Sequence, residues 1–207
     1  MDGFWEKHWP DWPEERIHQI EKYASLLKNY NQRINLVSRK DVDNLEEKHI
    51  LWSLSIARAG LLRSVASLAD IGTGGGLPGL PLAIAAPHVQ VTLVDSIEKK
   101  IRVLQEIIKE LNLTHVRAIR SRAEQIEGAF DLITGRAVCP LPEFVKTIRH
   151  LIKPGGRIAY LTGSPDPAER RIPGWKVEEI PVRDIFPKSQ ALSEKFILVA
   201  NPVTPPV

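Results

Sequence analysis

Residues 70–79 read DIGTGGGLPG, and this stretch decides the fold that we predict. It follows a short apolar run that suits a β-strand and precedes an apolar segment that suits a helix. Glycine occupies four of the five positions 72–76. Without Cβ atoms the chain can turn sharply, and a ligand can lie against its backbone. A tight strand-to-helix turn also favours glycine, but this density is higher than a turn alone requires. We therefore predict a nucleotide-like ligand at this loop.

Two classes of ligand fit the loop. It satisfies the dinucleotide fingerprint G-x-G-x-x-G, and Asp95 follows at about the distance where that motif places an acid for the ribose hydroxyls. Asp70 favours the other class, because a carboxylate repels a pyrophosphate and attracts a ligand that carries sulfonium and ammonium groups. The register Asp70-x-Gly72-x-Gly74-x-Gly76 is familiar in S-adenosylmethionine enzymes. We predict that S-adenosylmethionine contacts Asp70, Gly72, Gly74, Gly76 and Asp95. The alternative ligand is NAD.

Short runs rich in β-branched residues alternate with helical patterns on either side of the loop. The predicted strands are 68–71, 89–95, 116–120, 130–135 and 157–161. The predicted helices between them are 79–86, 97–111 and 141–152. Further strands over 177–185 and 196–200 would close the sheet as an antiparallel hairpin. Parallel strands joined by right-handed crossovers place helices on both faces of a sheet. We therefore predict an α/β fold with a Rossmann-like, doubly wound, mostly parallel seven-stranded sheet.

The first sixty residues follow a purely helical pattern. Apolar residues at helical spacing predict one helix over 14–34 and a second over 43–59. Three tryptophans precede the first helix, and aromatic residues at this spacing more often cover a core than stack on RNA bases. These core tryptophans are Trp5, Trp9 and Trp12. We divide the chain into an N-terminal helical extension, 1–60, packed on the core, and a second domain, 61–207, that contains the glycine loop.

The composition is that of an ordinary globular protein, with 43% hydrophobic and 26% charged residues. The formal net charge is only +3, and the excess lies in residues 138–207, which hold 10 basic and 7 acidic side chains. Folding can still gather basic side chains on one face, but charge alone gives weak support for a nucleic-acid partner. The composition therefore leaves the type of partner open.

The sequence offers no membrane span, secretory signal or metal site. The longest apolar stretch, 76–86, contains two prolines and is far shorter than the roughly 20 residues that cross a bilayer. Cys139 is the only cysteine, which excludes an internal disulfide and a multi-cysteine metal site. We interpret it as a loop filler and not as a nucleophile. We expect a cytoplasmic protein with no metal and no membrane partner.

Several blocks of sequence together resemble one family, the bacterial small-subunit ribosomal RNA guanine-N7 methyltransferases, also called glucose-inhibited division protein B. Upstream of the glycine loop, YNQRINL at 30–36 resembles the family pattern W-N-x-x-x-N-L, and KHILWSL at 48–54 resembles R-H-I-L-D-S-L. The remaining blocks are 68–86, VTLVDSIEKKIR at 91–102, RSRAE at 120–124, FDLITGRA at 130–137 and LIKPGGR at 151–157. The resemblance covers about residues 20–165 and is specific because the order of all these blocks is kept.

This resemblance implies a class I methyltransferase that uses S-adenosyl-L-methionine to methylate N7 of a guanine in 16S ribosomal RNA. It assigns cofactor contacts to Gly72, Leu77, Asp95, Ala123, Glu124 and Arg136. Arg136 is also the predicted catalytic residue, because its planar guanidinium suits a phosphate or the guanine carbonyl, and a structural ion pair is the alternative. The RNA-binding candidates are Asn35, Arg39 and His49. The implied partner is 16S ribosomal RNA or the small ribosomal subunit, and we expect a monomer.

The sequence also departs from the family pattern at three places outside the glycine loop. Trp52 replaces an Asp, GRAVCP at 135–140 replaces S-R-A-F-A-S, and LTG at 161–163 replaces L-K-G. Val138, Cys139 and Thr162 are among the changed residues. These departures put the RNA target in more doubt than the cofactor.

The chemistry of the expected acceptor explains why the sequence needs no catalytic triad. Guanine N7 has a lone pair and no proton, so its methylation requires placement and exclusion of water but no obligatory base. The sequence indeed shows no convincing Ser/His/Asp or metal-binding pattern. Two alternatives remain: a methyltransferase that acts on another acceptor, and a nicotinamide-dependent oxidoreductase. The absence of an evident tyrosine–lysine pair after the fourth strand counts against the oxidoreductase.

Overall fold

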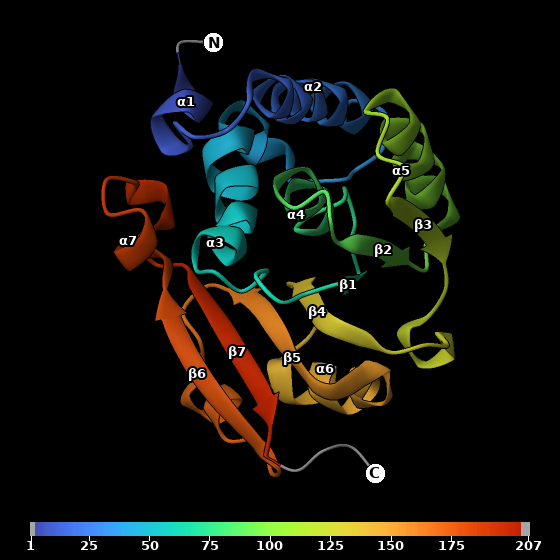
Figure 1. The fold of residues 1–207 in the computed structure, drawn as a ribbon, viewed down its shortest axis with the longest axis vertical. Coiled ribbons are helices and arrows are strands. Elements are labelled where there is room, and N and C mark those ends of the chain that lie inside the picture. Colours follow the sequence, from blue (N-terminus) through green and yellow to red (C-terminus); the bar gives the residue numbers. More distant parts are fainter. Residues whose placement is uncertain (1–2, 204–207) are drawn as a thin grey trace.

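The computed structural model describes residues 3–203, except the side chain of Arg39, and contains the predicted α/β sheet (Figure 1). The seven strands follow the order β3-β2-β1-β4-β5-β7-β6. Neighbours among β1 to β5 are parallel, and β7 is antiparallel to both β5 and β6. The strands are β1 Ser67–Ile71, β2 Gln90–Asp95, β3 Val116–Arg120, β4 Phe130–Arg136, β5 Ile152–Thr162, β6 Trp175–Pro181 and β7 Phe196–Pro202. The predicted fold class and the late antiparallel hairpin are confirmed.

Helices cover both faces of this sheet (Figure 1). The larger apolar cluster joins one face to α2, α3, α4, α5 and α7, and the smaller cluster joins the other face to α6. The α-helices are α1 Phe4–His8, α2 Glu14–Asn31, α3 Trp52–Arg58, α4 Gly79–Ala85, α5 Glu98–Glu110, α6 Leu141–Ile148 and α7 Val182–Ile185. The 3-10 turns are η1 Arg39–Asn44, η3 Ala123–Gln125, η4 Arg149–Leu151, η5 Pro167–Arg170 and η6 Gln190–Leu192, and η2 Glu46–Leu51 is a π turn.

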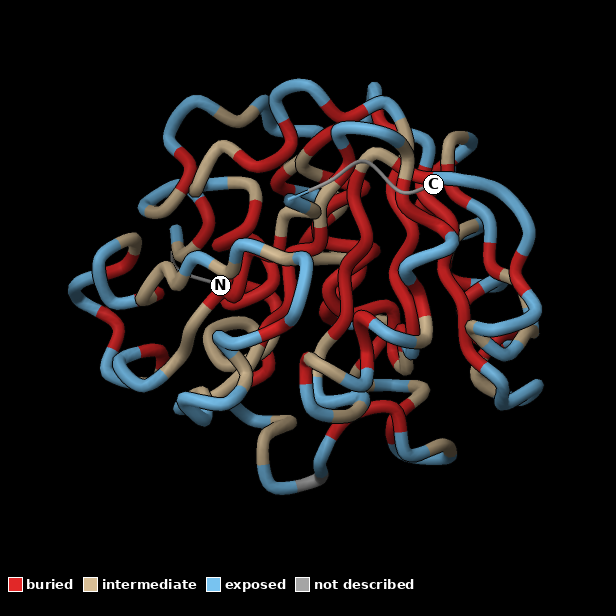
Figure 2. The backbone as a smooth tube through the Cα atoms, turned by 90° about the horizontal axis from the view of Figure 1, so that it is seen from below, coloured by how far each residue is buried: buried red, intermediate tan, exposed pale blue. Residues whose placement is uncertain are grey.

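The central strands are buried along almost their whole length (Figure 2). Such strands have apolar neighbours on both faces, which is why they appear in the sequence as uninterrupted apolar runs. In the register of β1, Ile71 pairs with Val94 of β2 and with Gly135 of β4. The carboxyl ends of these strands therefore meet at one edge. In open parallel sheets, ligands bind at this edge.

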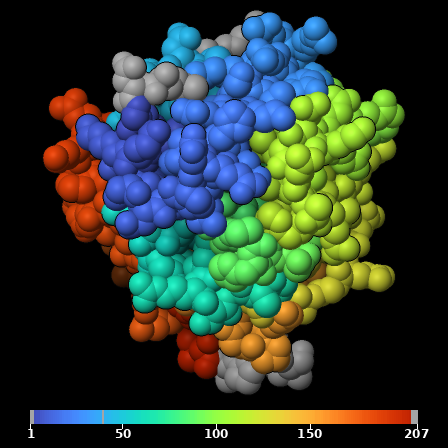
Figure 3. All heavy atoms as spheres, turned by 45° about the horizontal axis from the view of Figure 1, so that its top comes forward, coloured from blue at the N-terminus to red at the C-terminus, as the bar shows by residue number. Residues whose placement is uncertain are grey.

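The N-terminal residues pack on the rest of the chain through α1 and α2. Trp5 and Trp9 are buried, and Trp12 packs against the same apolar cluster, so the predicted core role of the tryptophans is confirmed. The hydroxyl of Tyr23, on α2, donates a hydrogen bond to the carbonyl oxygen of Gly75 over 2.9 Å. In Figure 3, α2 (blue) lies directly against the yellow-green α5. The extension thus contacts the glycine loop itself.

Four predicted elements differ clearly from the structure. The predicted strand over 157–161 is part of the longer β5, which begins at Ile152. The predicted helix over 141–152 ends at Ile148, and a 3-10 turn leads into β5 at Ile152. The predicted strand over 177–185 ends at Pro181, where α7 begins. The predicted helix over 43–59 consists of consecutive 3-10, π and α segments.

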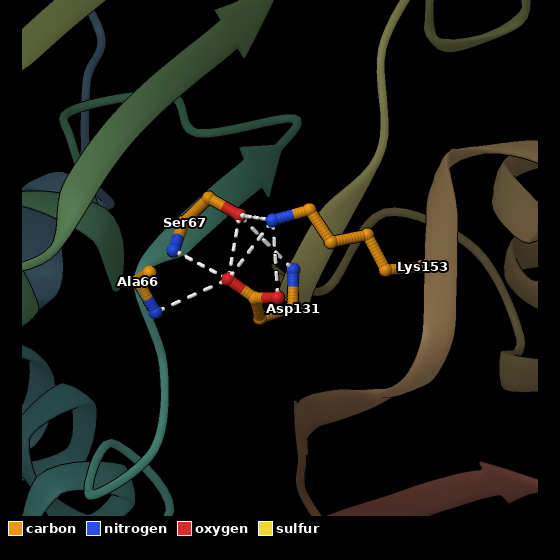
Figure 4. Close-up of polar contacts among 4 residues, drawn as sticks. All are labelled: Ala66, Ser67, Asp131 and Lys153. Carbon is orange, nitrogen blue, oxygen red and sulfur yellow. Dashed lines mark hydrogen bonds and ion pairs between the residues drawn. The ribbon is translucent and has the colours of Figure 1, made fainter.

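A polar cluster connects β1, β4 and β5 at the amino end of the sheet (Figure 4). Oδ2 of Asp131 accepts hydrogen bonds from the backbone N–H groups of Ala66 and Ser67, at 3.1 and 2.8 Å, and from the Ser67 hydroxyl at 2.8 Å. Nζ of Lys153 donates to Oγ of Ser67 at 2.9 Å and lies 3.1 Å from Oδ1 of Asp131. Burial alone would raise the pKa of the Asp131 carboxyl, but these hydrogen bonds outweigh it and lower the pKa below its usual value. The cluster holds the edge opposite the glycine loop.

Candidate functional site

A cavity of about 310 Å³ lies at the carboxyl ends of β1 to β4, beside the glycine loop. We call it the glycine-loop cavity. Its walls include Gly72, Asp95, Ser121, Ala123, Glu124 and Glu143. Four of these residues were predicted as cofactor contacts, and they come from three separate blocks of sequence. The size falls within the range of small-molecule sites, which hold a few polar groups among apolar walls.

The backbone of the loop explains why glycine occupies its first position. Gly72 has a φ of +70°, a conformation that side chains other than glycine rarely adopt. A Cβ atom at this position would lie only 2.7 Å from Cγ2 of Val138, across the wall of the cavity. Gly72 therefore brings bare backbone to the cavity. Gly74 and Gly76 also have positive φ angles, but they lie in the turn away from this wall.

Asp95 is held in place at the carboxyl end of β2. Its Oδ2 accepts a hydrogen bond from the backbone N–H of Gly74 at 3.1 Å, and its Oδ1 accepts one from the N–H of Ile97 at 2.9 Å. Nζ of Lys100 lies 3.5 Å from Oδ2. The carboxylate thus connects the glycine loop to the start of α5 and also forms part of the cavity wall. Each carboxylate oxygen of Asp95 has a further lone pair that can accept a hydrogen bond from a ligand hydroxyl group.

Asp70 lies beneath the loop instead of in the cavity wall. The side chain is fully buried, and its Oδ2 accepts hydrogen bonds from the Thr73 hydroxyl at 2.6 Å and the Gly79 N–H at 2.9 Å. Oδ1 accepts from the Thr134 hydroxyl at 3.0 Å. Burial raises the pKa of this carboxyl to about 6, although the hydrogen bonds act in the opposite direction. Asp70 therefore fastens both ends of the loop, and its contact with a cationic ligand stays a prediction.

The other predicted cofactor residues divide between the wall and the core. Ala123 and Glu124 belong to η3, which follows β3 and borders the glycine-loop cavity. Leu77 is buried in the apolar cluster, and its N–H donates to the carbonyl of Thr73 at 2.9 Å. Leu77 thus shapes the turn and does not line the cavity.

Arg136, at the end of β4, lies among an imidazole and an indole. Its Nη1 donates to Nδ1 of His49 at 3.0 Å, and its guanidinium carbon lies 5.5 Å from the centre of the Trp52 ring. Nζ of Lys195 lies 4.9 Å from the same ring. Within the described part of the chain, no carboxylate lies within 4.0 Å of Arg136, so the ion pair considered as its alternative role is not formed there.

His49 is neutral in these surroundings. Burial and, to a lesser extent, the nearby charge of Arg136 lower the pKa of its imidazole to about 4, while Asp41 acts in the opposite direction. Since Arg136 can only donate, Nδ1 must be the acceptor and Nε2 carries the proton. Nε2 is buried 3.7 Å from Oδ2 of Asp41. His49 belongs to the π turn η2, and such turns often occur at functional sites.

A second cavity, also of about 310 Å³, adjoins the first. We call it the Trp52 cavity, and its walls include Trp52, Val138, Cys139, Tyr160, Thr162 and Glu169. Val138 and Cys139 line both cavities, so only this short segment separates them. The hydroxyl of Tyr160 fixes the segment, because it accepts from the Val138 N–H at 3.0 Å and donates to the Cys139 carbonyl at 2.7 Å. All three places where the sequence departs from the family pattern contribute to this one cavity.

The predicted RNA-binding residues differ in their exposure. Asn35 is exposed after the end of α2, whereas the His49 side chain is only 14% exposed and faces Arg136. The side chain of Arg39 lies outside the described part of the structure. Across residues 3–203, no three His, Cys, Asp or Glu side chains are grouped to bind a metal, and none of the helices there is both long and apolar enough to cross a bilayer.

Sequence reasoning missed several residues at the two cavities. Glu143 lies on the first turn of α6, directly after β4, and that position is a usable signal because first turns after parallel strands face the ligand edge. Tyr160 lines the Trp52 cavity, and Lys195 lies over the Trp52 ring outside the cavity wall. Only the fold brings them together.

Comparison with known families decides the assignment. The model of the family described as rRNA small subunit methyltransferase G matches residues 16–173. The chain belongs to this family. The ribosomal RNA small subunit methyltransferase G of Flavobacterium psychrophilum is 44% identical over 165 residues, which cover 76% of this chain and 78% of the relative. That of Flavobacterium johnsoniae is 38% identical over 196 residues, with coverage of 92% and 90%. The family resemblance drawn from the sequence blocks is confirmed.

Solved structures of methyltransferases share the fold of this methyltransferase G family member. A ribosomal protein L11 methylase from Lactobacillus delbrueckii subsp. bulgaricus superimposes with a TM-score of 0.54 at 14% identity, over 74% of this chain and 77% of that one. A precorrin-6y C5,15-methyltransferase from Geobacter metallireducens gives a TM-score of 0.54 at 13% identity, over 81% and 90%. At such low identity the likeness concerns the fold, and it confirms the class I methyltransferase architecture.

Proposed function

We propose that this protein transfers the methyl group of S-adenosylmethionine to N7 of a guanine in 16S ribosomal RNA. One observation supports this function above the others: two cavities of similar size meet at Val138 and Cys139, at the ligand edge of a methyltransferase sheet. A methyl donor in one cavity and an acceptor base in the other would face each other across this segment. Membership of the methyltransferase family favours this donor over NAD.

The residues of the glycine-loop cavity fit the cofactor chemically. Asp95 offers carboxylate oxygens for ribose hydroxyls, and Gly72 offers backbone without a Cβ atom. Glu143 adds a second carboxylate that suits the cofactor's ammonium group. We expect Ala123 and Glu124, on the turn after β3, to border the adenine. When bound, the cofactor supplies an electrophilic methyl group on a sulfonium.

The Trp52 cavity fits a planar base. Trp52 and Tyr160 are among its lining residues, and aromatic side chains can stack on bases with about 1–3 kcal/mol each. Tyr160 also fixes the backbone between the cavities through two hydrogen bonds. A guanine inside an RNA helix cannot enter such a cavity, so the substrate must present an unstacked guanine.

Catalysis then depends on placement, since N7 attacks with a lone pair and loses no proton. Arg136, the proposed catalytic residue, keeps its charge at every working pH and has N–H groups to spare for a guanine carbonyl or a phosphate. No carboxylate of the described residues competes for them. His49 holds one of these N–H groups and thereby orients the fork.

A second candidate function has one observation in its favour. The residues that differ from the family pattern line the Trp52 cavity and leave the glycine-loop cavity largely unchanged. A methyltransferase with the same donor and a different acceptor would show this distribution. For either acceptor we propose a cytoplasmic monomer, and for the first a partner that is 16S ribosomal RNA or the small ribosomal subunit.

Two measurements test the proposal. Calorimetric titration should give binding of S-adenosylmethionine and of its demethylated product, weakened by Asp95→Ala and unchanged by Asp43→Ala, an exposed acid outside both cavities. Tight NAD binding without S-adenosylmethionine binding would rule out the donor. Labelled cofactor should then methylate small-subunit RNA or intact subunits at one guanine N7, which mapping of the modified base identifies. Donor binding without methylation of either substrate would favour the second candidate.

A further inference from the structure

A third cavity, of about 460 Å³, lies between the N-terminal α1, the end of α3 and the segment after α7. We call it the α1–α7 cavity. Figure 1 shows α1 and α7 as neighbours at one side of the molecule, and the dark blue and red atoms meet there in Figure 3. Its walls include Phe4, Lys7, His8, Arg58, Phe186 and Lys188. None of these residues belongs to the two cavities of the proposed reaction.

The floor of this cavity is aromatic and ordered by ring packing. The His8 ring lies edge-on to Phe4, with centroids 4.8 Å apart, and to Phe186, with centroids 5.7 Å apart. Phe186 is buried, and Trp9 packs against it at 5.7 Å. The cavity is therefore a built depression in the fold and not a gap between loops.

The rim of the cavity is positively charged. Lys7, Arg58 and Lys188 are exposed, and in the described part of the chain none of the three lies within 4.0 Å of a carboxylate. Glu47 is the one acid in the wall, and its Oε1 accepts a hydrogen bond from the Ser189 hydroxyl at 2.7 Å. The guanidinium carbon of Arg58 lies 5.7 Å from the centre of the Trp9 ring. Three cations around one cavity, none within 4.0 Å of a described carboxylate, attract an anionic ligand.

The topology places this cavity on the same edge of the sheet as the proposed reaction. Since β5 and β6 both run antiparallel to β7, they share a direction, and α7 follows the carboxyl end of β6 at Pro181. Helix α3 connects the sites directly, because it begins at Trp52 and ends at Arg58. Six residues of helix correspond to about 9 Å. One residue that lines the Trp52 cavity and one that lines the α1–α7 cavity thus lie about 9 Å apart along a single helix.

We propose that the α1–α7 cavity binds backbone phosphates of the single-stranded RNA that flanks the methylated guanine. This inference rests on the proposed function and extends it to a second contact point. Lys7, Arg58 and Lys188 neutralise the phosphates, and the site holds the strand while its guanine occupies the Trp52 cavity. Phosphate contacts of this kind position a nucleic acid and do not read its sequence.

The test compares two charge-matched triple variants. One is Lys7→Gln/Arg58→Gln/Lys188→Gln, and the control is Lys99→Gln/Arg63→Gln/Lys109→Gln, which removes equal charge from exposed positions elsewhere. Filter binding measures the affinity for in vitro transcribed 16S ribosomal RNA at KCl concentrations between about 50 and 200 mM. This range is used because the affinity that phosphate contacts contribute falls steeply with salt concentration. The cavity variant should bind about tenfold more weakly than the control at the lower salt concentration, and its slope of log K against log salt should be smaller by about 2.

Other readouts separate this inference from the proposed function. The affinity for S-adenosylmethionine and the melting temperature should match the wild type in both variants. In methyl transfer, the cavity variant should raise KM for RNA and leave kcat unchanged. Equal affinities and equal salt slopes for the two triple variants would overturn the inference, whereas a wild type that binds this RNA but never methylates it would overturn the proposed function alone.

Discussion

Nη1 of Arg136 and Nδ1 of His49 are joined by a hydrogen bond of 3.0 Å, across the gap between β4 and the π turn η2. A neutral imidazole is the only state of His49 that can accept this bond. The bond fixes one N–H of the guanidinium and directs the remaining ones. The orientation of Arg136 therefore depends on the protonation state of a side chain from the N-terminal extension.

Replacing Arg136 by lysine should lower methyl transfer at least about tenfold, which corresponds to about 1.4 kcal/mol of transition-state stabilisation. Lysine keeps the charge but loses the planar fork that contacts His49 and stacks near Trp52. The melting temperature should change little, since no ion pair is lost. Steady-state kinetics and thermal melts on one preparation measure both, and Arg149→Lys, at an exposed position, is the control. Wild-type turnover in the Arg136 variant would remove it from the site.

His49 should make the protein less stable in mild acid. Its folded pKa is about 4 and its ordinary value is 6.5, so the unfolded state binds more protons between these values. The stabilisation is fully present above pH 6.5 and is lost as the pH falls toward 4, by up to about 3 kcal/mol. Asp70, with a raised pKa of about 6, acts in the opposite direction over part of this range.

The comparison of wild type with His49→Gln isolates the histidine, because both contain Asp70. Urea unfolding at several pH values between 4 and 7.5 should show that the stability advantage of the wild type shrinks as the pH falls. A difference that stays constant over this range would mean that His49 does not titrate as described.

Alanine at Gly72 should weaken the binding of S-adenosylmethionine at least about tenfold. The new Cβ would lie 2.7 Å from Cγ2 of Val138, so either the wall of the cavity moves or the loop does. Gly155→Ala is the matched control, because Gly155 has a φ of +78° and a Cβ there meets no atom within 4 Å. Both variants should lose about 1–2 kcal/mol of stability from the backbone conformation. Calorimetry should show a binding defect in the Gly72 variant only, and equal affinities would mean that the ligand lies elsewhere.

Removing the Asp131 carboxylate should reduce stability by roughly 2–3 kcal/mol without reducing kcat. Asp131→Ala leaves Lys153 and the N–H groups of Ala66 and Ser67 without their acceptor (Figure 4). Because the folded pKa of Asp131 is lowered, its stabilisation is present above the ordinary carboxyl pKa and is lost as the pH falls through the folded value. Urea unfolding at pH 7 measures the loss. A variant with wild-type stability but impaired turnover would contradict the assignment of a structural role.

The central part of the fold was predictable because burial leaves a direct pattern in the sequence. Strands β1, β2 and β4 are buried on both faces, and β3, at the edge of the sheet, alternates between buried and exposed residues. All four lie close to their predicted positions. The later part was less predictable. Val182 continues an apolar run, but Pro181 has no N–H, and the Val182 N–H donates to the carbonyl of Lys195 over 2.8 Å. That bond is the last one between β6 and β7, and α7 then begins because the Phe186 N–H donates back to the Val182 carbonyl at 2.9 Å. A local apolar pattern does not show where this change occurs.

The residues of the candidate site were likewise predictable only in part. Gly72 and Asp95 were predicted from their places after successive strands, and Glu124 from the family resemblance; topology brings all three to one edge. The inward turn of Asp70 could not be predicted, since its partners Thr73 and Thr134 are separated along the chain and meet only in the folded protein. The Trp52 cavity was missed for the same reason.

The hydrogen bond from Tyr23 to the Gly75 carbonyl has a consequence for how the enzyme responds to its ligands. Leu27, one turn further along α2, lies so close that a Cβ atom on Gly75 would be 2.9 Å from its Cδ1. A donor molecule that shifts the loop must displace α2 as well, or break this bond. Thermodynamic linkage is reciprocal. If a bound donor changes the affinity for RNA by some factor, bound RNA changes the affinity for the donor by the same factor.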